Sequence, residues 1–183
     1  MKSFQEIRER IIRLGRAEYR YDRLVSDFGE HYTELVRANY QPLPDIAAFR
    51  CWLRHLVVEL RPGLLDAWRD MAGHYGFALG DKITAEGTGI YVVRMSCYPL
   101  EEIVRFAGFA VKKDGKRAQS SVEVAVKEHS SIQKHSESLD EAILRPLFFQ
   151  GSSRLANVQT FLQAETAELL ETISGSDGSH YVV

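Results

Sequence analysis

The sequence predicts a helix-dominated α+β protein, in which a long N-terminal helical hairpin and a C-terminal helix pack on a small antiparallel β-sheet of about two to four strands. Three observations predict this fold. Apolar residues recur at helical spacing through the first forty residues, alternation with a period of two appears between residues 83 and 129, and helical spacing returns between residues 139 and 174. A chain of 183 residues fits one compact domain, with residues 1–80 as its helical part and 175–183 as a flexible tail.

A heptad pattern predicts one long helix from about residue 3 to residue 39. A repeat that averages 3.5 residues keeps one apolar stripe on one side of a helix, as in the packing seam of a coiled coil or bundle. The stripe consists of Phe4, Ile7, Ile11, Leu14, Tyr21, Val25, Phe28, Tyr32 and Leu35.

Glu18 interrupts this stripe with a charge. Because burial of an unpaired charge is costly, we expect Glu18 either to meet an arginine from another segment or to mark a place where the seam is open. An open seam would offer a partner helix a surface made of Glu18, Tyr21, Phe28 and Tyr32.

Two prolines, Pro42 and Pro44, predict a turn after the first helix, and Asp45 is positioned to cap a second helix. The wide apolar face of this second helix extends to Leu60, and we expect it to lie antiparallel beside the first helix. Pro62 then predicts the start of a short third helix, since proline is tolerated in a first turn.

Alternating apolar residues between 91 and 97 predict a β-strand. The dipeptide Asp114-Gly115 predicts a hairpin with a two-residue type I′ turn, because that turn needs positive φ at both central positions. With this loop Val111 faces Ala118 and Arg105 faces Val124. Residues 99–111 fit a strand of this hairpin, and a helix that starts at Pro99 is the alternative.

The polar stretch 130–138 predicts a surface loop that ends in a helix cap. From Leu139 the helical spacing returns. Pro146 and Gly151 divide the following segment, and a final helix extends to about Ile173.

Charge is unevenly distributed along the chain, although the net formal charge is only −2. Residues 1–23 hold seven basic and four acidic side chains, whereas residues 137–183 hold two basic and seven acidic ones. The two ends could attract each other or meet different partners. The N-terminus lacks the apolar core of a secretory signal, and no apolar run approaches the length of a membrane span. Cys51 and Cys97 each lie within an apolar pattern, which favours core cysteines in a reducing compartment, so we expect a cytoplasmic protein without membrane contact.

Motifs for catalysis, metals and cofactors are missing from the sequence. It contains no phosphate-binding loop, no Cys-x-x-Cys pair and no Glu-x-x-His repeat, so we expect neither a cofactor nor a metal. An enzyme site could still be assembled from scattered residues such as His55, Glu59, Cys97 and His129.

A cationic hairpin is the other feature that suggests a function. Its basic residues are accompanied by Phe106 and Phe109, a combination that suits a phosphate backbone and stacked bases. Lysines on an edge strand also prevent sheets from pairing with one another, which is the structural alternative. The basic residues are Arg105, Lys112, Lys113, Lys116 and Arg117.

These observations favour a non-enzymatic interaction protein, an adaptor or a regulatory subunit, whose long helix meets a protein partner or a second copy of the chain. Nucleic-acid binding by the basic hairpin and the arginines of the first helix is the alternative. An enzyme whose site has no sequence motif is the third hypothesis.

Overall fold

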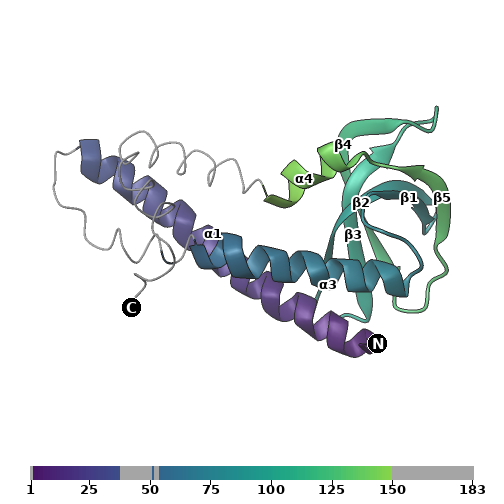
Figure 1. The fold of residues 1–183 in the computed structure, drawn as a ribbon, viewed down its shortest axis with the longest axis horizontal. Coiled ribbons are helices and arrows are strands. Elements are labelled where there is room, and N and C mark those ends of the chain that lie inside the picture. Colours follow the sequence, from purple (N-terminus) through teal and green to yellow (C-terminus); the bar gives the residue numbers. More distant parts are fainter. Residues whose placement is uncertain (1, 38–50, 52–53, 150–183) are drawn as a thin grey trace, which may run out of the picture.

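The computed structural model describes residues 2–37, 51 and 54–149, with side chains for residues 2–23, 51, 54–144 and 147. One antiparallel sheet forms the centre of the fold, with helices on its two faces (Figure 1). No helix among these residues is both long and apolar enough to cross a bilayer. The elements are α1 (Phe4–Arg37), η1 (Leu56–Leu60), α3 (Arg61–His74), β1 (Asp81–Ala85), β2 (Thr88–Cys97), β3 (Ile103–Val111), β4 (Arg117–Lys127), β5 (Gln133–Ser138) and α4 (Glu141–Phe149).

The five strands follow the order β4-β3-β2-β1-β5. The first four form a meander, and β5 returns to pair with β1. A two-residue turn joins β1 to β2, with Glu86 at φ 47° and Gly87 at φ 73°, the positive values of a type I′ turn. Because β1 is half as long as β2, it pairs only with the first residues of β2, from Thr88 to Tyr91.

The main core lies between one face of the sheet and the helices α1 and α3. Ile11 of α1, Trp68 and Met71 of α3, and Phe106 of β3 are all nearly inaccessible to solvent there. The other face is covered more sparsely, by Leu139 and the helix α4, whose Leu144 packs beside buried tyrosine and valine side chains of β2.

Helices α1 and α3 lie antiparallel, and ion pairs join them at both ends. Near the N-terminus the Lys2 Nζ lies 2.8 Å from an Asp70 carboxylate oxygen. Toward the middle of α1 the Arg61 Nε lies 3.3 Å from a carboxylate oxygen of Glu18. The two helices are in close contact at Gly63 of α3, where an added Cβ would lie 3.6 Å from the Leu14 side chain, an ordinary van der Waals distance.

The predicted fold class is wrong in its emphasis, although α+β is correct. The fold is organised around a five-stranded sheet rather than a small accessory one, and the described residues show no long N-terminal helical hairpin. The turn at Pro42 and Pro44 and the helix start at Asp45 lie outside the described residues. Apolar periodicity predicts which face of a helix is buried, but it does not identify the element that covers that face.

The predicted start of a short third helix at Pro62 is confirmed, since α3 begins at Arg61 with this proline in its first turn. The helix η1 continues directly into it. At the junction the Arg61 N–H bonds to the Leu56 carbonyl, five residues back, which is the widened spacing of a π-helix. A proline lacks an N–H and crowds the preceding turn of a helix, so a local widening at this position accommodates it.

Residues 103–111 form the strand β3 and not a helix, but the predicted hairpin register is wrong by one residue. Val111 lies opposite Arg117, and Val124 lies opposite Phe106 instead of Arg105. The cause is the loop, in which the Gly115 N–H bonds to the Lys112 carbonyl and Gly115 has φ 82°, as in a three-residue turn with a glycine bulge. A shift of one residue reverses the faces of β3, so Val104, Phe106 and Gly108 are buried.

The stretch predicted as a polar loop forms the edge strand β5 over Gln133–Ser138. An edge strand with polar side chains on both faces shows no apolar alternation, which is why the pattern did not predict it. The helix expected after Leu139 is present as α4, but it continues through Pro146 instead of ending there. The predicted final helix and the tail 175–183 lie outside the described residues.

Candidate functional site

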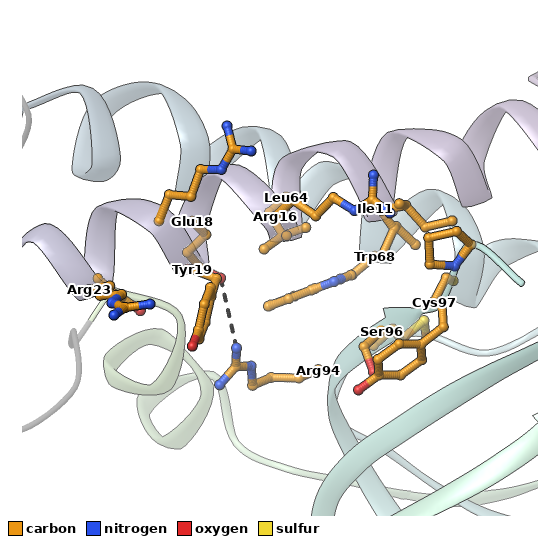
Figure 2. Close-up of a pocket in the computed structure, with 17 residues that line it drawn as sticks. Ile11, Arg16, Glu18, Tyr19, Arg23, Leu64, Trp68, Arg94, Ser96 and Cys97 are labelled. Carbon is orange, nitrogen blue, oxygen red and sulfur yellow. Dashed lines mark ion pairs between the residues drawn. The ribbon is translucent and has the colours of Figure 1, made fainter. Parts of the chain in front are cut away.

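A groove of about 1020 Å³ lies between α1, α3 and the end of β2 (Figure 2). Aromatic and arginine side chains dominate its walls. The lining residues are Ile11, Ile12, Gly15, Arg16, Glu18, Tyr19, Arg20, Asp22, Arg23, Leu64, Trp68, Arg94, Met95, Ser96, Cys97, Tyr98 and Pro99.

The α1 wall arises from helical spacing. Tyr19 and Arg20 lie three and four residues after Arg16, and Arg23 lies four and three residues after them, so the four side chains share a face of the helix. This polar stripe lies beside the apolar seam that packs on α3. The sequence indicated the arginines of the first helix as a possible nucleic-acid surface, but not that they share a groove with Tyr19.

The opposite wall is formed by consecutive residues at the end of β2. A bulge at Val93 shifts the pairing with β3 between Val92 and Arg94. After it the Met95 and Cys97 side chains are buried in the main core, whereas Arg94 is exposed.

Trp68 of α3 and Leu64 line the groove from the core, and both are nearly inaccessible to solvent. The Arg94 guanidinium lies 5.7 Å from the centre of the Trp68 ring, in cation–π range. Among the described residues the buried indole Nε1 of Trp68 has no hydrogen-bond partner.

The floor of the groove contains a cluster of ion pairs centred on Glu18. Its carboxylate oxygens lie 3.3 Å from the Arg61 Nε and 3.8 Å from an Arg94 Nη2, the contact dashed in Figure 2. The Arg61 Nη2 also lies 3.2 Å from an Asp22 oxygen. The expectation that Glu18 meets an arginine from another segment is confirmed. Burial nevertheless raises the pKa of Glu18, against the lowering effect of Arg94 and Arg61.

Positive charge prevails on the groove surface. Arg16, Arg20, Arg23 and Arg94 line it against two acids, Glu18 and Asp22. Both acids are paired with Arg61, which does not itself line the groove, so the arginines of the lining outnumber its acids and the groove surface is cationic.

The rim carries exposed apolar surface. Tyr19 is 69% exposed, Tyr98 is 42% exposed, and Leu100 beside Pro99 is 98% exposed. Tyrosine and arginine are the residues that contribute most to binding energy in protein interfaces, together with tryptophan.

A second, smaller groove of about 580 Å³ lies on the other side of the same stretch of α1. It shares Arg16, Arg20 and Pro99 with the first groove and adds Arg8 and Arg13. The arginine stripe of α1 therefore forms a ridge between two hollows.

The residues of the predicted basic hairpin lie in two places, because Arg105 is separated from the other four. Arg105 lies near the start of β3, where its guanidinium nitrogens are 3.2 Å from a Glu101 oxygen and 3.5 Å from a Glu123 oxygen. Lys112, Lys113 and Lys116 project from the turn at the far end of that strand and are exposed.

At this turn the Arg117 guanidinium lies 4.7 Å from the centre of the Phe109 ring. Phe106, the other aromatic residue of the prediction, is fully buried and presents no face to a base. The tip has exposed cations, but it lacks the pair of accessible aromatic faces that the sequence suggested.

The scattered residues considered for an enzyme are likewise separate. Cys97 lines the groove, but burial raises the pKa of its thiol to about 11. His55 is engaged with Glu59, at 2.7 Å between Nδ1 and a carboxylate oxygen, and neither residue lines the groove. The part of the chain that the structure describes contains no group of three potential metal ligands.

Of the proposed partner seam, Glu18 lines the groove, whereas the Tyr21 ring packs 5.0 Å from the His55 ring and lines the smaller hollow. The side chains of Phe28 and Tyr32 lie outside the described part. The seam therefore contributes Glu18 to the groove, and the neighbouring stripe of α1 contributes Arg16, Tyr19, Arg20 and Arg23.

Comparison of the chain with protein-family models, curated proteins and solved structures gave no match.

Proposed function

We propose that this chain is a non-enzymatic interaction protein that binds a protein partner in the groove between α1 and β2. The composition of the groove carries the proposal. Tyr19, Tyr98 and Trp68 combine with Arg16 and Arg94 in one concave surface, the combination that provides most of the binding energy at protein interfaces.

The ion pairs beneath the groove support this proposal. Arg61, Glu18 and Asp22 fix α1 and α3 to each other directly under the groove. A surface held in one conformation before binding loses less entropy when a partner docks. The raised thiol pKa of Cys97 and the lack of a histidine among the residues that line the groove argue against catalysis there.

The test is capture of partners from native cells with the full chain and two variants. Tyr19→Ala combined with Tyr98→Ala removes exposed rings that contribute little to the core, so we expect loss of captured protein at unchanged thermal stability. The matched control replaces Lys112, Lys113 and Lys116 by Ala at the hairpin tip, and we expect it to retain every partner.

The opposite pattern would contradict the proposal. If the tip variant loses its partners and the tyrosine variant keeps them, the hairpin is the binding surface. If nuclease treatment releases all captured material, the alternative of a nucleic-acid-binding protein replaces the proposed function.

A further inference from the structure

The end of β2 is a strand edge that is open to the groove. On the side of β1, pairing stops at Tyr91, and one further bond joins the Gly80 N–H to the Val92 carbonyl. Within the described part of the chain, no backbone bond reaches this edge between Arg94 and Cys97, although the same residues pair with β3 on their other side.

The lining of the groove shows that this edge is accessible. Six consecutive residues, 94–99, line it. Successive side chains of a strand point to opposite faces of a sheet, and those of Met95 and Cys97 enter the core. A hollow that contacts all of these residues in turn therefore lies along the edge of the strand. In an antiparallel strand the N–H and C=O groups of alternate residues point toward each edge, so some of them point into this groove.

The groove has two walls that an extended chain would contact. The α1 stripe lies across from the strand edge, and Figure 2 shows Tyr19 and Arg94 facing each other over the hollow. An added strand would lie about 4.8 Å from β2. Its side chains would alternate between the apolar wall at Ile11, Leu64 and Trp68 and the opposite face with Arg94.

We propose that the groove binds an extended peptide segment that adds to β2 as a further strand, with acidic side chains alternating with apolar ones. Main-chain bonds to β2 would supply affinity, and the arginines Arg16, Arg20 and Arg94 would select carboxylates. This inference rests on the proposed function, and it specifies the chemistry of the partner.

The experiment uses the full chain and two peptide libraries of about ten residues, the length of a long strand. In one library Glu alternates with Val, Ile, Leu or Phe, and in the other Lys replaces Glu. We expect selection from the acidic library alone. For the tightest selected peptide, Arg94→Glu and the pair Arg16→Glu with Arg20→Glu should each weaken binding at least about tenfold, since each tenfold loss is about 1.4 kcal/mol.

An N-methyl scan of the selected peptide tests strand addition itself. Methylation removes one backbone donor at a time, and donors point toward β2 only at every second residue. We expect methylation at every second residue of the peptide to weaken binding strongly, and methylation at the residues in between to change the affinity little. This scan alters the peptide and not the protein, so misfolding of a variant does not affect it.

The outcomes separate this inference from the proposed function. If acidic peptides bind but the N-methyl scan shows no alternation with a period of two residues, strand addition is overturned and the groove stands as a protein-binding site. Selection of basic peptides, or no selection at all, would overturn the inference, while the tyrosine variant still tests the groove. A salt-dependent affinity for a 20-nucleotide oligouridine that is lost in Arg16→Glu with Arg20→Glu would assign the arginines to nucleic acid and overturn both.

Discussion

The groove and the hairpin tip are both cationic, but their surroundings differ. In the groove, arginines lie beside tyrosine and tryptophan in a hollow, and the ion pairs of Glu18 connect the helices that form the floor of the groove. At the tip lysines project into solvent from a turn, and the accessible aromatic ring of Phe109 already has Arg117 over it. A concave surface removes water from several contacts at once, whereas a projecting turn keeps its charges hydrated. The two regions carry similar charge but differ in shape. This difference favours a binding role for the groove and a solvated edge for the tip.

The largest effect that we expect comes from Arg61→Ala, which removes the ion pair with Asp22 and leaves Glu18 with the more distant Arg94. The side chains of Arg61 and Glu18 are only 8% and 13% exposed, so loss of the pair should lower the free energy of unfolding by about 3–5 kcal/mol. Denaturant titration measures it. The control Arg94→Ala removes an exposed arginine and should cost less than about 1 kcal/mol. Equal losses in the two variants would mean that Arg61 is not the main stabilising partner of the cluster.

A smaller effect is expected at the tip. Gly115 has φ 82° and a Cβ there would meet only the Lys82 Nζ at 3.6 Å, so Gly115→Ala introduces backbone strain without a clash. Strain of this kind costs about 1–2 kcal/mol, measurable as a lower thermal midpoint. We expect partner capture to be unchanged, and its loss would show that the tip takes part in binding.

The matched control for Gly115→Ala is Gly73→Ala in α3, where a Cβ meets nothing within 4 Å. Alanine in a helix should raise stability by about 1 kcal/mol. Destabilisation of both glycine variants would contradict the role that we assign to positive φ at Gly115.

These two regions also show how far the sequence alone could predict the molecule. The heptad stripe predicted α1 and the isolated charge of Glu18 predicted an arginine partner, because both depend on burial and local spacing. The hairpin turn was predicted at the correct glycine but with the wrong loop length, since Asp-Gly is compatible with two-residue and three-residue turns. A type I′ turn occurs instead at Glu86-Gly87.

The groove itself could not be predicted, because it needs contacts between distant segments. Arg94 and Trp68 line the same groove as the α1 stripe because β2 extends beyond the end of β1. This extension depends on the relative lengths of the two strands. Neither strand length nor the bulge at Val93 has a distinctive composition. The spacing of Arg16, Tyr19, Arg20 and Arg23 was visible in the sequence, but a charged stripe on a helix is usually a solvated face.

The smallest expected effect is a pH dependence at the groove floor. Burial raises the pKa of Glu18 above its ordinary value of 4.5, so the folded protein binds this proton more tightly than the unfolded chain does. The protonated Glu18 carboxyl therefore contributes stability at a pH below its pKa in the unfolded chain. This contribution is lost as the pH rises through the pKa of Glu18 in the folded protein. Glu18→Gln removes this titration, while Arg61, Arg94 and Asp22 still face the site.

Unfolding free energies of the wild type and Glu18→Gln, measured in parallel from pH 4 upward, should therefore converge or cross in favour of the variant as pH increases above about 4.5. A wild type that gains stability relative to the variant over this window would mean that the arginines, and not burial, dominate the ionisation of Glu18.

Hydrogen exchange of the full chain, free and bound to its captured protein partner, tests the central claim most directly. We predict slower exchange in the complex for residues 12–23 and 94–98, with no change at residues 112–117. Protection confined to residues 112–117, with the groove exchanging as in the free protein, would contradict the assignment of the groove as the binding surface.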